Sequence, residues 1–462
     1  MSIRDSIRPI FPPTLRAFMN QMDLLSNQLT ELGSQLSQSN QSLITLQKEV
    51  QSLKAENTYL KNTVDALFKR SKYVNLEYGL TDSVDNSSIL IAGWYGASNF
   101  GDELMLRTLI NAFPSEALSR ITVLIWDDYS YQRSSISPEV SVLHYPNCMW
   151  DLSWLADHFD TLVWGGGAII DELQYNDDIE NYNTGNIFIR LSKMMLEKGK
   201  SVFCLGLSSI DSLVNRSYIQ ELRYIVEGSK IFSLRDPFSR ETLIRSGISE
   251  ESISLCEDIA FANEDLPKLP KYVQNHSNDL IKVGLVALTS ESLQQHYLQL
   301  LERLLSFTYK DKRIDITLIP FLNENSHDTY YYQQLINMLS QNACIKIAPY
   351  SSSLEDLHFE KYDLVISYKY HSALISLAQE VSTICVVDEM HPHYGNKMKH
   401  LVRLFGNEKR LVNTDSFLMV LESFIKDALT EESSCTIDKA TIENIFKHEE
   451  ATLKKECLAI SQ

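Results

Sequence analysis

From residue 88 to residue 388 the sequence alternates short apolar runs, rich in β-branched residues, with longer stretches of helical periodicity. This alternation constrains the fold most strongly, because strands separated by helical crossovers pair in parallel. A polar, proline-containing stretch at 266–281 divides the runs into two series. We therefore predict an α/β fold of two Rossmann-like domains that face a central cleft.

A heptad pattern precedes the α/β region. Apolar residues occupy nearly every a and d position from Met22 to Leu67, and only Ser39 and Asn57 interrupt the stripe. Two apolar residues per heptad make a narrower stripe than a helix needs when it packs on its own globular body. Asn57 at an a position favours parallel, in-register pairing. We predict a parallel homodimer through residues 22–67, with a trimer as the alternative because leucine fills three of the seven a positions.

These patterns predict the domain organisation. Before the first α/β domain come a flexible tail, a coiled coil and a linker, at 1–20, 21–70 and 71–86. The Rossmann-like domains span 87–265 and 282–407, on either side of the linker at 266–281. Two helical stretches at 408–462 are expected to pack on the outside and cross back to the first domain.

The formal net charge of −18 is unevenly distributed. Residues 1–72 have a balance of +3, so the rest of the chain carries −21. Nucleic acids and anionic membranes bind to clustered Lys and Arg, which such an acidic body lacks. We expect no nucleic-acid partner, and any anionic substrate requires a local cluster of cations.

The sequence favours a cytoplasmic location. No apolar run reaches the ~18 residues of a membrane span, and the N-terminus lacks the apolar core of a signal peptide. Seven cysteines are scattered without metal-ligand spacing, as in proteins of a reducing compartment. The tail at 1–20 combines apolar residues with arginines and would permit peripheral contact with a membrane, but its prolines favour disorder.

Four strand ends carry residues suited to chemistry, because open α/β sheets bind ligands where strands end and helices begin. The first is GWYGASNFGDE, in which Asn99, Asp102 and Glu103 lie where the next helix starts. The motif is not GxGxxG, so it gives little support for a nicotinamide cofactor. Asp102 is equally suited to cap the helix.

The second strand end is the glycine run WGGGAIIDE. Gly166 and Gly167 permit a ligand to approach the main chain, and Asp171 follows them. An isolated run of this kind is also typical of an ordinary turn.

The third and fourth strand ends carry positive charge. In SLRDPFSRETL, helix capping explains the Asp-Pro pair but leaves Arg235 without a structural role. In SYKYHSALISLA, Lys369 and His371 end a buried strand just before a helix. A histidine there fits a structural role or an anion site equally well.

The order of these motifs resembles the polysaccharide pyruvyl transferase family. The series runs from GWYGASNFGDELMLRTLI through WGGGAIIDE, SLRDPFSRETLIRSGI and EDIAFA to SYKYHSALISLAQE and NKMKHLVRLFG, over roughly residues 89–406. The resemblance implies two Rossmann-like domains as in GT-B glycosyltransferases. It also implies transfer of pyruvate from phosphoenolpyruvate onto two hydroxyls of a sugar, which forms a ketal on a cell-surface polysaccharide or its precursor.

The resemblance also implies site residues. Arg235 matches the arginine of the family's R-D-P-x-S motif, His371 matches the histidine of its R-x-H-A motif, and Lys397 matches the lysine before its last cleft helix. Two positions depart from the family: Lys369 replaces an arginine and Ser372 an alanine. Lysine keeps the charge but loses the planar fork that grips an anion at two points. A longer turn, DEMHPHYGN, also precedes Lys397.

These residue types suit the implied chemistry. Phosphoenolpyruvate carries about three negative charges near pH 7, which Arg235, Lys369 and Lys397 would offset. His371 suits acid or base catalysis at neutral pH. Asp102, Glu103 and Asp171 are candidates to hold or deprotonate the saccharide acceptor. We expect no metal and no cofactor besides the donor substrate, since the histidines and acids of DEMHPHYGN are better explained as a solvated loop.

Two other functions remain open. The same architecture would serve a glycosyltransferase that uses a nucleotide sugar, although no glutamate for the ribose stands near SYKYHS. The Lys369 departure would suit a non-catalytic assembly protein carried on a coiled coil.

Overall fold

The computed structural model describes most of the chain. The described residues are 17–36, the single positions 39, 42, 46 and 50, and 89–126, 136–146, 149–175, 183–210, 212–273, 280–322, 327–339, 344–388, 392–430 and 439–462. The chain divides into two compact units, Met1–Leu80 and Thr81–Gln462. The domain boundaries proposed from the sequence remain predictions at this level.

The N-terminal unit contains a continuous helix over residues 17–36. The a and d side chains of this helix are exposed to solvent: Met22, Leu25, Leu29, Leu32 and Leu36 are each 49% to 69% accessible. A leucine stripe exposed along one helix face is unusual unless a partner covers it. The pairing itself is a prediction, and Asn57 together with the later heptads lies outside the described residues. In the described part of the chain, no helix is both long and apolar enough to cross a membrane.

The first sheet of the second unit is parallel and has the strand order β3-β2-β1-β4-β5-β6-β7. This is the doubly wound order that two βαβαβ halves produce. Its strands are β1 Ile89–Ala92, β2 Ile121–Ile125, β3 Ser141–His144, β4 Thr161–Ile170, β5 Ser201–Ser209, β6 Ile231–Leu234 and β7 Ser254–Leu255. Its helices are α3 Phe100–Ala112, α5 Met149–His158, α6 Thr184–Glu197, α7 Arg216–Gly228 and α8 Pro237–Arg245.

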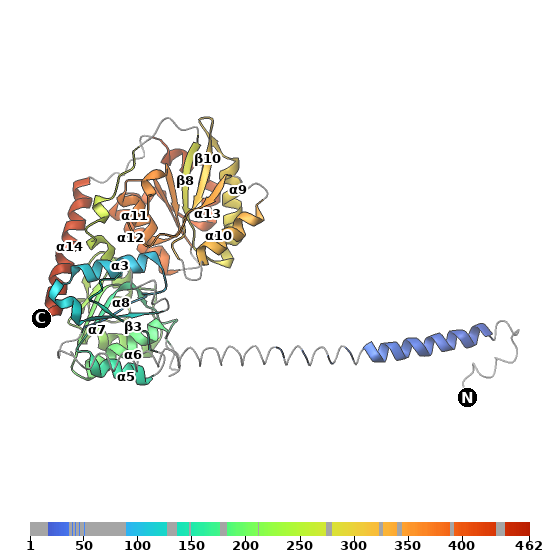
Figure 1. The fold of residues 1–462 in the computed structure, drawn as a ribbon, viewed down its shortest axis with the longest axis horizontal. Coiled ribbons are helices and arrows are strands. Elements are labelled where there is room, and N and C mark those ends of the chain that lie inside the picture. The colour runs from blue at the N-terminus through green and yellow to red at the C-terminus, as the bar shows by residue number, and fades with distance from the viewer. Residues whose placement is uncertain are drawn as a thin grey trace. The chain divides into compact units, whose positions relative to one another are not determined.

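The second sheet repeats this order as β11-β10-β8-β12-β13-β14, with the short β9 antiparallel to β10. Its strands are β8 Leu280–Val286, β9 Thr308–Tyr309, β10 Lys312–Leu318, β11 Ile345–Ile347, β12 Leu364–Ser367, β13 Thr383–Val387 and β14 Leu411–Asn413. Its helices are α9 Gln294–Ser306, α10 His327–Met338, α11 Tyr370–Ala378, α12 Pro392–Leu404 and α13 Thr414–Ala428. The predicted α/β fold with parallel sheets is confirmed (Figure 1).

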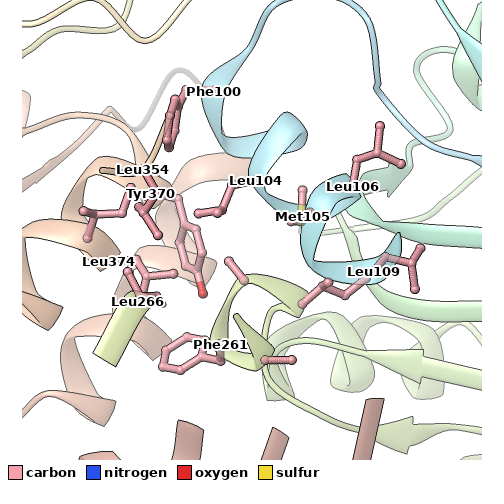
Figure 2. Close-up of a cluster of buried hydrophobic side chains, with 14 of the residues drawn as sticks. Phe100, Leu104, Met105, Leu106, Leu109, Phe261, Leu266, Leu354, Tyr370 and Leu374 are labelled. Carbon is pink, nitrogen blue, oxygen red and sulfur yellow. The ribbon is translucent and has the colours of Figure 1, made fainter. Parts of the chain in front are cut away.

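Both halves share one hydrophobic core. Phe100 and Leu104 of α3, from the first half, belong to the same buried cluster as Tyr370 and Leu374 of α11, from the second. Figure 2 shows Leu104 beside Tyr370 in the middle of this cluster, with Phe100 at one end and Phe261 at the other. The second half also has a core of its own, built on β8 and β10. The halves are therefore joined by packing as well as by their linker.

The last helix returns to the first half, as predicted. Helix α14, Lys439–Ser461, runs back alongside α3 (Figure 1) and buries Phe446, Leu453 and Cys457 in the shared core. At its end, the Arg120 guanidinium donates a 2.7 Å hydrogen bond to the Ser461 carbonyl. Helix α14 therefore holds α3 in place, and the N-terminus of α3 forms part of the site described next.

A candidate active site between the two sheets

A cavity of about 420 Å³ lies where strand ends of both halves meet. The residues that line it include candidates from all four strand ends. The first half provides Trp94, Asn99, Asp102, Gly167, Ala168, Ile169, Gln174, Thr184 and Arg235. The second half provides Leu288, Thr289, Phe321, Leu322, His327, Lys369, Tyr370, His371 and Lys397. We call this cavity the cleft.

Arg235 and His371 meet on a buried carboxylate. Arg235 follows β6, and its Nη1 lies 2.5 Å from Oδ2 of Asp258, which is fully buried. The Nε2 of His371 lies 3.4 Å from Oδ1 of the same carboxylate. Burial alone would raise the pKa of Asp258, but His371 and Arg235 hold it well below its ordinary range. Asp258 therefore stays ionised and ties together a cation from the first half and a histidine from the second.

The Arg235 guanidinium keeps part of its hydrogen-bonding capacity. Its Nη2 donates to Ser208 Oγ over 2.8 Å, while its buried Nε has no hydrogen-bond partner in the described part of the chain. A buried donor without a partner costs free energy. An anion bound in the cleft is one way to satisfy such a donor.

Gly101 allows the close approach of His371 to helix α3. A Cβ placed on Gly101 would lie 1.9 Å from Nδ1 of His371, so no other residue fits there without moving the ring. Asn99 caps this helix and accepts a hydrogen bond from the Gly101 N–H. The sequence GASNFGDE thus positions the first turn of α3 directly against the histidine of the other half.

Lys397 adds a second cation near the same point. It lies within α12 rather than before a helix, and its Nζ is 5.9 Å from the centre of the Tyr370 ring. The Arg235 guanidinium lies 5.3 Å from the same ring. Burial, with Arg235 close by, lowers the pKa of Lys397 to about 7. Near neutral pH this side chain can therefore give or take a proton.

Asp102 is the acid that faces these cations. It lies in the first turn of α3 and lines the cleft. Burial raises its pKa to about 6, although His371, Lys397 and Arg235 counteract part of that effect. A carboxyl group with this pKa is suited to proton transfer near neutral pH.

Lys369 lines the cleft but already has a partner. Its Nζ donates a 2.7 Å hydrogen bond to Oδ2 of Asp328, which is fully buried. Asp328 also accepts hydrogen bonds from the backbone N–H groups of Phe321 and Leu322. The charge of Lys369 is thus largely balanced within the second half.

Three predicted site residues are not among those that line the cleft. The Glu103 carboxylate accepts a 2.9 Å hydrogen bond from the Gly96 N–H and so holds the turn after β1. Asp171 accepts a bond from Leu173 N–H and another from the Gln174 amide. Gly166 packs against Met105. Each supports the walls of the site. Gly167, in contrast, lines the cleft with φ of +95°, a backbone conformation that favours glycine.

Sequence reasoning missed four residues of the site. Asp258 belongs to the motif EDIAFA, which entered the family resemblance without a role, and Asp328 opens α10 with no motif around it. Trp94 and Thr184 line the cleft and were not singled out. The position of Trp94 directly after the first strand was the one available signal.

No group of three or more His, Cys, Asp or Glu residues suited to a metal ion occurs among the described residues. Three residues of the DEMHPHYGN turn, 389–391, lie outside them. Five of the ionisable residues that line the described cleft could act in a reaction. They are Arg235, Lys369 and His371, together with Lys397 and Asp102, whose pKa values lie near neutrality. This set is suited to binding a polyanion and moving protons beside it.

The chain is similar to known proteins in sequence and in fold. A sequence model of the polysaccharide pyruvyl transferases matches residues 99–388. No curated protein matches the sequence. Among solved structures, the chain is similar to a glycosyltransferase from Rickettsia africae at 10% identity and a TM-score of 0.49, over 81% of this chain and 99% of that one. It is also similar to HepE from Anabaena in complex with UDP and glucose, at 12% identity and a TM-score of 0.46, over 81% and 97% of the two chains.

Proposed function

Because the chain belongs to the polysaccharide pyruvyl transferase family, we propose that it transfers pyruvate from phosphoenolpyruvate onto two hydroxyls of a saccharide, with release of phosphate. The product is a cyclic ketal on a polysaccharide or its precursor. The observation that carries the proposal is the convergence of Arg235, His371 and Lys397, from both halves, on one cleft.

The cations account for donor binding. Phosphoenolpyruvate combines a carboxylate with a phosphate that is mostly dianionic near pH 7. Arg235 offers its charge and its unpaired Nε–H to one of these groups, and Lys397 offers a point charge to the other. In a unit as acidic as this one, such a pair of cations on one cleft is a specific arrangement.

The proton-transferring groups account for the addition step. Asp102, when ionised, accepts the proton of the first hydroxyl as that oxygen bonds to C2, and His371 delivers a proton to C3, which becomes a methyl group. The second hydroxyl oxygen then bonds to C2 as the bond between C2 and the phosphate oxygen breaks. Its proton leaves with the phosphate as hydrogen phosphate. Transfer of the first hydroxyl proton from Asp102 to His371 then restores both groups, so that overall one hydroxyl proton ends in the methyl group and the other on the phosphate.

The direct test is phosphate release from phosphoenolpyruvate in the presence of β-linked hexosides. We expect the wild type to release phosphate and His371→Ala to be slower by about 10²-fold or more, as general acid–base catalysis predicts. His358→Ala is the matched control, because His358 is exposed and paired with Glu360. Equal rates for wild type and His371→Ala would overturn the mechanism. Full activity in excess chelator is expected for a transfer that needs no metal.

Thermal unfolding in the presence of ligands distinguishes the two alternative functions. Thermal stabilisation by uridine or guanosine nucleotides, with no effect of phosphoenolpyruvate, would favour a glycosyltransferase. Stabilisation by neither ligand would favour a non-catalytic assembly protein.

The exposed leucine stripe of residues 17–36 supports a parallel homodimer as part of the proposal. Leu29→Glu places a charge in the seam and is expected to weaken the dimer. Light scattering of the full chain would measure this. An unchanged mass would show that the stripe is not the dimer contact. A cytoplasmic location, where the donor and a nucleotide- or lipid-linked acceptor precursor would both be met, completes the proposal.

A further inference from the structure

Arg235 and Trp94 line the cleft from different strand ends of the first sheet. Arg235 follows β6, whereas Trp94 follows β1, and β4 and β5 lie between these strands. Strands are about 4.8 Å apart, so the two strand ends are roughly 14 Å from each other. Asp102 lies on α3, the helix that follows Trp94, and the charges of His371 and Arg235 both lower its pKa. The cleft is therefore long enough for a donor at one end and a second substrate at the other.

Trp94 is held in place while part of its surface stays open. It is 41% exposed, although it lines the cleft. Its indole lies 5.5 Å from that of Trp126, which stacks on Tyr145 at 4.3 Å. The Tyr145 hydroxyl in turn accepts a hydrogen bond from the Gly93 N–H and donates one to the Gly93 carbonyl. Three rings and two hydrogen bonds thus fix the indole without covering it.

The chemistry of an indole face selects its ligand. The face is electron-rich, so it repels the carboxylate and phosphate of an anionic donor and attracts groups with partial positive charge. The axial C–H bonds of a pyranose form such a face, whereas the hydroxyls project around its rim. A rigid, open indole that lies three strands away from Arg235 fits a sugar ring better than it fits the donor.

Thr184 provides a second, independent observation. Its side chain is 3% exposed and lines the cleft, yet its Oγ1 has no hydrogen-bond partner among the described residues. A buried hydroxyl without a partner is costly. A sugar hydroxyl, which both donates and accepts, would satisfy it.

We propose that Trp94 and Thr184 form the acceptor subsite, in which Trp94 stacks on the apolar face of a pyranose and Thr184 binds one of its hydroxyls. The assignment of this sugar as the acceptor rests on the proposed function, whereas the binding of a sugar ring at Trp94 does not.

The first experiment measures binding without donor. Methyl β-D-hexopyranosides of several configurations, and their disaccharides, are titrated into the full chain while tryptophan fluorescence is recorded. We expect a saturable change with at least one sugar. Trp94→Ala should lose it and weaken binding about tenfold or more, Trp94→Phe should bind in between, and Thr184→Val should weaken binding by less. Tyr224→Ala is the matched control, because Tyr224 is a 44% exposed aromatic residue on α7.

The second experiment separates this inference from the proposed function. In the phosphate-release assay, Trp94→Ala should raise the KM for the saccharide and leave the KM for phosphoenolpyruvate within about twofold. An unchanged saccharide KM in an active enzyme, or no sugar response in any titration, would overturn the subsite. Sugar binding that depends on Trp94, with no phosphate release at all, would leave the subsite standing and remove the donor. Trp94→Phe keeps the ring stack and so guards against loss of folding.

Discussion

The two halves of the body each place a basic side chain at a strand end against a fully buried aspartate, yet the two pairs differ in what else they hold. Arg235 of the first half pairs with Asp258, whose other oxygen faces His371 across the cleft. Lys369 of the second half pairs with Asp328, whose other partners are backbone N–H groups and a threonine hydroxyl.

We propose that Arg235–Asp258 is a reacting pair and that Lys369–Asp328 is a positioning pair. Asp258 orients two side chains that face the cleft. Asp328 fixes the segment Phe321–Leu322, and Phe321 accepts a 2.9 Å hydrogen bond from the Phe100 N–H at the start of α3. Lys369 thus acts on the site through the position of α3. Lys369, which replaces an arginine of the family, belongs to the proposed positioning pair with Asp328.

Breaking the reacting pair should have the largest effect. Asp258→Asn removes the charge that holds Arg235 and His371, and we expect kcat/KM to fall by about 10²–10³-fold, since a misplaced acid–base group loses a factor of this size. Phosphate-release kinetics measure this, and circular dichroism controls for folding. A folded variant with less than a tenfold loss would contradict the role of Asp258.

Gly101→Ala tests whether the position of His371 in the reacting pair matters, because it moves the ring and leaves the residue itself unchanged. In Gly101→Ala the new methyl group overlaps the imidazole, so we expect kcat to fall by about 10²-fold, while the KM for phosphoenolpyruvate changes little because the cations remain. The control is Gly395→Ala, at a helical glycine with open space around it. Comparable losses in both variants would show that helix stability, not ring position, is responsible.

The pH profile reports on the groups that surround the reacting pair. If Asp102 acts as a base, activity rises as it ionises through pH of about 6, and if Lys397 acts as a cation, activity falls as it loses its proton through about 7. We expect a narrow bell-shaped profile of kcat/KM with its optimum between these values. Asp102→Asn should remove the acidic limb and retain the basic one. A profile that keeps its acidic limb in this variant would assign that limb to another group.

Much of this fold was predictable from the sequence, because β-rich runs such as TLVWGGG and helix caps such as Asp236-Pro237 are local signals. The return of α14 to the first half was also predictable, since an amphipathic helix after the last strand needs an apolar surface. Helix α5 and strand β14 were not predicted, and α12 begins before Lys397 rather than after it. Their patterns are short or polar, and tertiary packing determines them.

The site was predictable only where a side chain lacked a structural explanation. Arg235 met that criterion and lines the cleft. Asp258 and Asp328 did not, because each is explained as a helix cap until its basic partner from another segment is placed beside it. Glu103 and Asp171 illustrate the converse, since acids at glycine turns commonly bind the backbone of the turn itself.

Restoring the family's arginine in the positioning pair should have the smallest effect. Lys369→Arg offers Asp328 a bidentate partner in the same place, and we expect kcat/KM for phosphoenolpyruvate to stay within about threefold. Lys369→Met, in contrast, leaves Asp328 without its cation and should lower the melting temperature. A tenfold gain in donor affinity for Lys369→Arg would mean that residue 369 grips the donor directly. In that case the two pairs would share one role, because each would bring a cation from its own half to the same anion.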